Sequence, residues 1–197
     1  MDEAVRLLRS GGLVCYPTDT VYGIGAAAGD DGAVRRLFAV KGRPPSKAVP
    51  LLLSESGDAA QVAEVTPLAK TLATHFWPGA LTIVMRKADG YRSVALAGAD
   101  TVALRVPDDS LVRGIVRGLG EPITGTSANR AGAPAPVSAA EVALQMGEMV
   151  DLIIDGGRSR ARVESTVIDI TGEGPEILRE GAVSREEVAE AIGQAVR

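Results

Sequence analysis

Residues 13–25 read LVCYPTDTVYGIG, an apolar run that ends at a proline and continues into a polar turn and two glycines. The apolar run 13–16 has the length of a buried strand, and Pro17 cannot continue a ladder of backbone hydrogen bonds. The turn 18–20 then places two hydroxyls and a carboxylate beyond the strand end, where α/β sheets hold small polar ligands. The stretch indicates an α/β fold with a binding site here, and an ordinary turn that satisfies its own backbone remains the alternative.

Helices and strands alternate along the rest of the chain. Apolar spacing and end signals predict helices over 2–9, 30–41, 66–76 and 111–119, and further helices from the capping boxes at 138–141 and 184–187. Strands are predicted over 48–53, 81–86, 102–106, 122–124, 152–154, 166–170 and 176–178. The last two strands resemble a hairpin, so the sheet is expected to be mixed rather than purely parallel.

The composition of the 197 residues bounds the kind of protein. With 46% hydrophobic and 3% aromatic residues, the core is expected to consist mainly of Val, Leu, Ile and Ala. No linker divides the chain, so residues 1–197 are expected to form a single domain. Cys15 is the only cysteine and His75 the only histidine, which excludes an internal disulfide, a structural zinc site and a cluster of histidine ligands. No apolar run could cross a bilayer and no signal segment follows Met1, so we expect a cytoplasmic protein without membrane contact.

Three cations leave the helix predicted over 30–41 and enter a proline-bounded loop, Lys41-Gly42-Arg43-Pro44-Pro45-Ser46-Lys47. The helix dipole favours a lysine at a helix C terminus, so Lys41 alone needs no further role. Arg43 and Lys47 lie beyond the helix, and a stiff loop lowers the entropy lost when they grip a polyphosphate. Because the stretch matches neither a Walker motif nor a kinase glycine loop, it indicates a phosphate-binding surface of another kind.

Other polar groups lie at the ends of predicted strands. Residues 124–130, TGTSANR, suit phosphate or ribose oxygens, but they are also typical of a plain turn. Residues 162–169, RVESTVID, place small hydroxyls where an apolar strand begins. Arg105 and Arg179 end apolar strands, where a guanidinium is costly to bury without a carboxylate, phosphate or carbonyl partner. A structural ion pair and a ligand contact are both compatible with these two arginines.

Together these stretches resemble the YrdC-like family of threonylcarbamoyl-AMP synthases. The resemblance runs from Gly12 to Ser184 and is carried by PTDTVYGIG (17–25), KGRP (41–44), WPGALTIV (77–84), VALRVP (102–107), TSAN (126–129), ESTVID (164–169) and ILREGA (177–182). It implies the short, single-domain form of the family, with an α/β (α+β) fold in which helices flank a twisted, mixed sheet with a concave basic face. The implied reaction is that of a nucleotidyltransferase, an L-threonylcarbamoyladenylate synthase. It makes threonylcarbamoyl-AMP and pyrophosphate from L-threonine, bicarbonate and ATP, for the N6-threonylcarbamoyladenosine modification of tRNA.

The resemblance also implies roles for individual residues. Lys41 and Arg43 are the implied catalytic cations. The implied ATP-binding residues are Arg43, Lys47, Thr101, Ser127, Asn129 and Arg179, and the implied threonine-binding residues are Thr20, Arg105, Gly125 and Ser165. The resemblance implies no metal site on the protein itself, because the expected Mg²⁺ is carried by the phosphates of ATP. The expected partner that takes the adenylate is the tRNA threonylcarbamoyl transferase.

Three positions depart from the family's pattern. Leu52 stands where many relatives place a histidine that contacts threonine, and Ala135 replaces a serine on the nucleotide side. Asp108-Asp109 replaces a histidine that often follows the proline of the VALRVP segment. We expect these departures to change affinity rather than reaction type.

Two other functions use the same features. A YrdC-like protein could hold structured RNA on its basic face without turnover, although the net charge of −4 gives no overall attraction to nucleic acid. A carbamoyltransferase of the hydrogenase-maturation or antibiotic-tailoring type would adenylate a carbamate on the same fold, but such enzymes usually carry further domains.

Overall fold

The computed structural model describes all residues from 1 to 197. The α-helices are α1 (Asp2–Arg9), α2 (Asp31–Lys41), α3 (Pro67–Phe76), α4 (Ser110–Leu119), α5 (Ala139–Met146) and α6 (Arg185–Ile192). Short 3₁₀ helices are η1 (Ser56–Gln61), η2 (Val94–Leu96) and η3 (Gly147–Met149). The strands are β1 (Val14–Tyr16), β2 (Gly23–Gly25), β3 (Leu51–Leu52), β4 (Leu81–Arg86), β5 (Thr101–Arg105), β6 (Ile123–Thr124), β7 (Thr126–Ser127), β8 (Leu152–Ile153), β9 (Thr166–Asp169) and β10 (Glu176–Arg179). None of the helices is long and apolar enough to cross a membrane.

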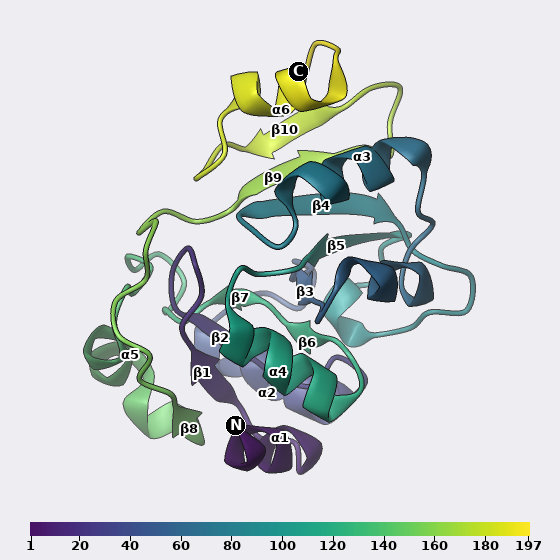
Figure 1. The fold of residues 1–197 in the computed structure, drawn as a ribbon. Coiled ribbons are helices and arrows are strands. Elements are labelled where there is room, and N and C mark those ends of the chain that lie inside the picture. Colours follow the sequence, from purple (N-terminus) through teal and green to yellow (C-terminus); the bar gives the residue numbers. More distant parts are fainter.

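Two mixed sheets form the frame of the molecule (Figure 1). One has four strands in the order β7-β2-β1-β8, and the other has six in the order β10-β9-β4-β5-β3-β6. Strand β1 is antiparallel to β2 and parallel to β8, and β4 is antiparallel to β5 and parallel to β9. The expected mixed α/β class is confirmed, as is the hairpin of β9 and β10. The expected single sheet is corrected to two.

The two sheets meet just beyond Gly25, where β2 ends. There Thr124 N donates to Ala26 O at 2.9 Å and Ala28 N donates to Pro122 O at 2.9 Å, so the segment after β2 runs beside β6 of the other sheet. A Cβ at Gly25 would lie 2.9 Å from the Tyr16 ring and 3.0 Å from the Thr124 carbonyl oxygen. Only glycine allows the backbones to approach this closely, so Gly25 permits the junction between the sheets.

Strand β1 is buried on both faces, which explains why its three residues are all apolar or aromatic. Val14 and Tyr16 belong to a smaller apolar cluster with residues of α1 and α4, whereas Cys15 belongs to the larger cluster with residues of α2. Figure 1 shows α4 in front of β1 and β2 and the fainter α2 behind them. The turn 18–20 therefore directly follows a strand that is held in place by packing on both faces.

Helix ends agree closely with the sequence signals. The Asp30 side chain caps α2, the Thr66 side chain caps α3 ahead of Pro67, and Ser184 forms the expected capping box. The capping box expected at Ser138 is only half present, because the Glu141 carboxylate accepts from Val137 N instead of closing back on Ser138.

Strands agree less well. The run 48–53 contributes only the two residues of β3, and β2 and β7 were not predicted. These two strands pair with each other, Gly23 with Ser127 and Ile24 with Thr126. Their glycines and hydroxyls carry no strand pattern, so tertiary pairing decides their conformation.

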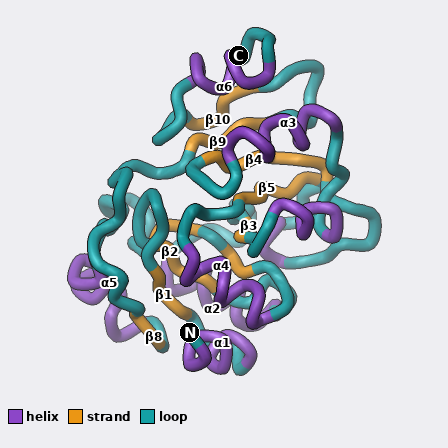
Figure 2. The backbone as a smooth tube through the Cα atoms, viewed as in Figure 1, coloured by secondary structure: helices purple, strands orange, loops and turns teal.

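A long loop connects the two sheets along one edge of the molecule. Figure 2 shows residues 154–165 running from β8 of the four-stranded sheet to β9 of the six-stranded sheet. On the way, Ala161 N donates to Asp19 O at 2.9 Å and Arg162 N donates to Thr20 O at 3.0 Å. The loop thereby fixes the backbone of the polar turn that follows β1.

Candidate active site

A cavity of about 630 Å³ is lined by residues of both sheets. Strands β1, β2 and β7 contribute from the four-stranded sheet, and β3, β4, β5, β9 and β10 from the six-stranded sheet. All eleven residues to which the sequence resemblance assigns a role line this cavity: Thr20, Lys41, Arg43, Lys47, Thr101, Arg105, Gly125, Ser127, Asn129, Ser165 and Arg179. The fold thus brings every predicted site residue together, while their individual roles stay predictions.

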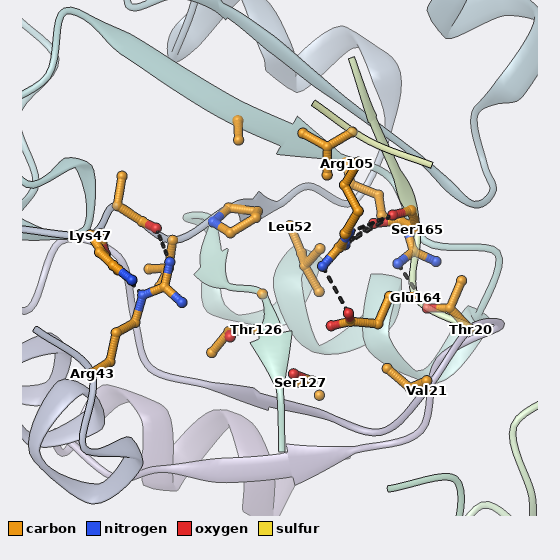
Figure 3. A pocket seen from close by; sticks show the side chains of 18 of the residues that line it. Thr20, Val21, Arg43, Lys47, Leu52, Arg105, Thr126, Ser127, Glu164 and Ser165 are labelled. Atoms are coloured by element: carbon orange, nitrogen blue, oxygen red, sulfur yellow. Dashed lines mark hydrogen bonds and ion pairs between the residues drawn. The ribbon is translucent and has the colours of Figure 1, made fainter. Parts of the chain in front are cut away.

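The cations divide between two ends of the cavity. In Figure 3, Arg43 and Lys47 lie on one side, Thr20, Arg105 and Ser165 lie on the other, and Leu52 lies between them. Arg43 and Lys47, two of the expected nucleotide-binding residues, are therefore separated from the expected threonine-binding residues Thr20, Arg105 and Ser165. Arg179, another expected nucleotide-binding residue, lies beside Ser165 instead.

Lys41 is the last residue of α2 because Gly42 takes a left-handed conformation with φ 62° and ends the helix. Its side chain is only 5% exposed. Nζ donates to Ser127 O at 2.5 Å and to Asn129 O at 2.8 Å, and it lies 3.5 Å from Asn129 Oδ1. Burial, helped by the charge of Arg43, lowers the pKa of Lys41 to about 8. Lys41 therefore holds the segment around Ser127 and Asn129 in place and adds a desolvated charge beneath it.

Arg43 fixes the loop that it begins. Nε donates to Lys47 O at 2.9 Å and Nη2 donates to Ala48 O at 2.6 Å, so the guanidinium closes the loop onto itself. Partial burial lowers the pKa of Arg43. Because a guanidinium has five N–H groups, three stay available for an anion. The stiffness expected from the prolines is thus reinforced by Arg43 itself.

The segment after β6 offers hydroxyl and amide groups to the same cavity, and Figure 3 shows Ser127 between its two ends. Ser127 Oγ makes no hydrogen bond within the chain, whereas Asn129 Nδ2 donates to Ala133 O at 2.5 Å. Thr101, the first residue of β5, lies half-buried on the cavity wall. Because Ser127 Oγ has no partner within the chain, its hydroxyl is free to bind a ligand.

Arg105 ends β5 and is only 6% exposed, yet it lines the cavity. Nη2 donates to Asp19 Oδ1 at 2.5 Å and Nη1 donates to Thr20 Oγ1 at 2.9 Å. Burial lowers the pKa of Arg105, and the nearby Asp19 carboxylate opposes this shift. Arg105 therefore forms the structural ion pair that was one of the two alternatives from the sequence. Its guanidinium also lines the cavity, so a ligand contact stays compatible with the structure.

Ser165 comes directly before β9 and lies beside Arg179, the last residue of β10. Ser165 Oγ lies 2.9 Å from Thr82 Oγ1, and Arg179 Nη2 donates to Ser165 O at 2.9 Å. Arg179 Nη1 also donates to Glu164 Oε2 at 2.9 Å, in an ion pair whose side chains are 44% and 39% exposed. Glu164 is the only acidic side chain that lines the cavity, and it was not predicted. Its place in the ESTVID segment was the one available signal.

The apolar floor of the cavity was also missed. Val84, Ala103 and Val167 come from the three adjacent strands β4, β5 and β9. On β5, Thr101, Ala103 and Arg105 alternate with buried residues, as expected of one face of a strand. This period of two was the signal that could have identified Ala103 as a lining residue.

Of the three departures from the family pattern, only Leu52 lines this cavity. It packs over Gly125, where an added Cβ would lie 2.5 Å from Leu52 Cγ. Ala135 is not among the lining residues, and Asp108 and Asp109 line a smaller polar cavity of about 390 Å³.

The fold and the cavity define a class of protein: an α/β protein with a cationic, hydroxyl-lined site suited to a phosphorylated ligand beside a small polar one. The family model of the Sua5, YciO and YrdC proteins, described as telomere recombination, matches residues 6–181. The chain belongs to this family.

Named relatives and solved structures agree with this membership. The threonylcarbamoyl-AMP synthase of Pyrococcus abyssi is 41% identical over 97% of this chain, which spans 56% of that protein. The threonylcarbamoyl-AMP synthase of Vibrio cholerae is 33% identical over 92% of this chain and 97% of that protein. The crystal structure of P. abyssi Sua5 complexed with L-threonine superposes with a TM-score of 0.94 at 40% identity, covering 99% of this chain and 58% of that one. The chain thus spans a little over half the length of its P. abyssi relative.

Proposed function

We propose that this chain is an L-threonylcarbamoyladenylate synthase, which converts L-threonine, bicarbonate and ATP into threonylcarbamoyl-AMP and pyrophosphate. The observation that carries the proposal is the convergence of all eleven implied residues on one cavity with two separate polar ends. The names of the P. abyssi and V. cholerae relatives support it, and the second of these has nearly the length of this chain.

The reaction consists of two bond-forming steps. The threonine amine attacks the carbon of bicarbonate, a C–N bond forms, and water is lost to give a carbamate. A carbamate oxygen then attacks the α-phosphorus of ATP, and the bond to the pyrophosphate oxygen breaks. Such transfers depend on positioning and on charge neutralisation more than on covalent help from the protein.

The residues of the cavity fit these demands. Arg43 has three N–H groups free for phosphate oxygens, and Lys47 extends the same cationic loop. Lys41 acts through the segment that it holds, because its ammonium already faces the oxygens of Ser127 and Asn129. Arg105 and the hydroxyls of Thr20 and Ser165 would receive threonine at the other end.

Magnesium enters this proposal with ATP. No group of three His, Cys, Asp or Glu side chains is arranged to hold a metal ion, and the lone carboxylate of the cavity, Glu164, is paired with Arg179. Mg²⁺ bound to the phosphates would add positive charge where negative charge develops in the transition state. The chain would then need cationic and hydroxyl groups for the phosphates, rather than a metal site of its own.

The product is a mixed anhydride of a carbamate and a phosphate, a reactive acyl donor. A transferase must therefore take it over before water does, and we infer the transferase that modifies an adenosine of tRNA. Cytoplasmic location goes with this function, because ATP and the tRNA acceptor are found together there.

The test is threonine-dependent release of pyrophosphate from ATP and bicarbonate. Arg43→Ala and Ser127→Ala should lower the rate at least about tenfold, which corresponds to about 1.4 kcal/mol of transition-state stabilisation. Arg35→Ala is the matched control, because Arg35 is exposed on α2, pairs with Asp31 and does not line the cavity. Circular dichroism should show that all three variants remain folded.

Two outcomes would contradict the proposal. Unchanged rates in Arg43→Ala and Ser127→Ala would remove the assigned site. A wild-type protein that retains RNA at high salt and releases no pyrophosphate would favour an RNA-binding function.

A further inference from the structure

Arg105 is held by protein groups on three of its nitrogen atoms. Nε donates to Gly79 O at 2.8 Å, Nη1 to Thr20 Oγ1 at 2.9 Å and Nη2 to Asp19 Oδ1 at 2.5 Å. These bonds use three of the five N–H groups of a guanidinium and leave one on each terminal nitrogen. A carboxylate accepts two N–H groups in a bidentate contact, so the free pair suits one carboxylate.

Asp19 contacts Arg105 but does not line the main cavity, so it lies on the side of Arg105 that faces away from a bound ligand. Its side chain is about 10% exposed, and Oδ1 also accepts from Asp108 N at 3.2 Å. The backbone carbonyl of Asp19 accepts from Ala161 N at 2.9 Å, in the loop that joins the two sheets. Contacts within the chain thus fix the Asp19 carboxylate without a bound ligand.

The other two arginines of the cavity are held differently. Arg43 contacts only backbone carbonyls of its own loop, and Arg179 pairs with the half-exposed Glu164. Arg105 alone has a buried carboxylate behind it. Of the groups that fix the Arg105 guanidinium, Asp19 is the only charged one, and removing one partner of a buried ion pair leaves the other charge without compensation.

We propose that Asp19 is a positioning residue for the carboxylate of the amino-acid substrate. It holds the Arg105 guanidinium in the one orientation that turns two free N–H groups toward the cavity. Asp19 acts through Arg105 and does not itself touch the substrate. The inference rests on the proposed function, because that function supplies the amino acid bound at this end.

The experiment compares Asp19→Asn with Asp108→Asn. Both replace an aspartate that lines the smaller polar cavity by its isosteric amide, but the Asp108 carboxylate pairs with the exposed Arg160 rather than with Arg105. The Kd of L-threonine and of L-threoninol, which lacks the carboxylate, is measured by calorimetry for each protein. The KM values for threonine and ATP are measured by pyrophosphate release.

We expect Asp19→Asn to weaken L-threonine binding about tenfold or more and L-threoninol binding less than about twofold. The KM for threonine should rise in parallel, while the KM for ATP stays within about twofold. Asp108→Asn should change none of these values by more than about twofold. A general loss of structure would instead weaken the binding of both threonine and threoninol, and it would raise the KM values for threonine and ATP together.

The inference is overturned if folded Asp19→Asn binds threonine as tightly as the wild type does. It is also overturned if the affinities for threonine and threoninol fall by the same factor. Should Asp19→Asn not fold, Asp19→Glu keeps the charge while displacing the carboxylate by one methylene, and the same selective loss of threonine is expected. Wild-type protein that binds threonine but releases no pyrophosphate would refute the proposed function alone. Wild-type protein that prefers threoninol to threonine would refute the inference alone.

Discussion

Lys41 illustrates at the scale of one residue what sequence can and cannot foresee. Its position at a helix C terminus and beside a cationic loop was readable from the sequence. The sequence did not indicate that its ammonium is buried against the carbonyls of Ser127 and Asn129, because that contact joins segments 86 and 88 residues apart. Burial therefore adds an anchoring contact at Lys41, while the catalytic role that the sequence resemblance implies for it stays a prediction.

Glu164 and Asp19 show the same limit for acidic residues. Both lie in quoted motifs, yet neither was assigned a role, because a carboxylate next to hydroxyls looks like ordinary turn chemistry. Only the fold pairs Glu164 with Arg179 and Asp19 with Arg105.

The lowered pKa of Lys41 predicts a particular dependence of stability on pH. Its pKa is about 8 in the folded protein against 10.5 for a free lysine. Below pH 8 Lys41 is charged in both the folded and the unfolded protein, and burying this charge lowers the stability of the folded protein. Between pH 8 and 10.5 the unfolded chain binds more protons than the folded one, so stability rises with pH. The free energy of unfolding of the wild type, relative to Lys41→Met, should increase by about 3 kcal/mol across this range.

Urea unfolding of both proteins at pH 7 and pH 10.5, without ligands, measures this difference. Lys70→Met on α3 is the control, because it removes an exposed lysine instead of a buried one. A wild type and Lys41→Met whose stabilities run parallel over this range would mean that Lys41 is not desolvated.

At the scale of elements, helices were predicted well because their signals are local. A capping side chain, a proline in the first turn and a left-handed glycine all act within a few residues, as at Asp30, Pro67 and Gly42. Strands β2 and β7 have two or three residues each. Strand β2 pairs with the nearby β1, but β7 pairs only with β2, across about a hundred residues of chain. No window of sequence contains that information, which is why the division into two sheets was not foreseen.

The packing of β3 against the turn after β6 gives a prediction at this scale. Gly125 N donates to Pro50 O at 2.7 Å, which holds the turn against the chain just before β3. A methyl group at Gly125 would lie 2.5 Å from Leu52 Cγ, closer than real contacts allow. Gly125→Ala should therefore destabilise the protein by about 1–3 kcal/mol through overpacking.

Leu52→Ala alone should cost about 2–5 kcal/mol, because Leu52 is buried and its loss leaves a cavity. The double variant should cost less than the sum of the two, since the shortened side chain makes room for the new methyl group. A double-mutant cycle by urea unfolding measures the coupling. Strictly additive costs would contradict the close contact between residues 52 and 125.

At the scale of the whole molecule, the seven matching segments predicted the site better than any single motif. Taken alone, the polar stretches were compatible with ordinary turns, and the net charge of −4 gave no sign of a cationic face. The structure gathers five of the basic side chains around one cavity with a single carboxylate: Lys41, Arg43, Lys47, Arg105 and Arg179. Net charge is a property of the whole chain and says nothing about such a local excess.

The distribution of that excess predicts how the binding of the two proposed substrates depends on salt. No carboxylate is paired with Arg43 or Lys47, whereas Arg105 has Asp19 behind it. The end with Arg43 and Lys47, proposed for the nucleotide, therefore carries uncompensated positive charge and attracts a polyanion. The end with Arg105, proposed for threonine, is close to neutral. Mobile ions screen charge within about 8 Å at 0.15 M ionic strength, so salt should weaken ATP binding more than threonine binding.

Raising KCl from 50 to 300 mM at a fixed concentration of free Mg²⁺ should increase the KM for ATP about three- to tenfold and the KM for threonine less than about twofold. Lys47→Ala should raise the KM for ATP at low salt and reduce its salt dependence, because one of the screened charges is already missing. Arg35→Ala again serves as the control, since Arg35 lies on α2 outside the cavity lining. Equal salt dependence of both KM values would mean that the positive charge is shared along the whole cavity, and that the ion pair of Asp19 with Arg105 does not divide it into a charged and a neutral end.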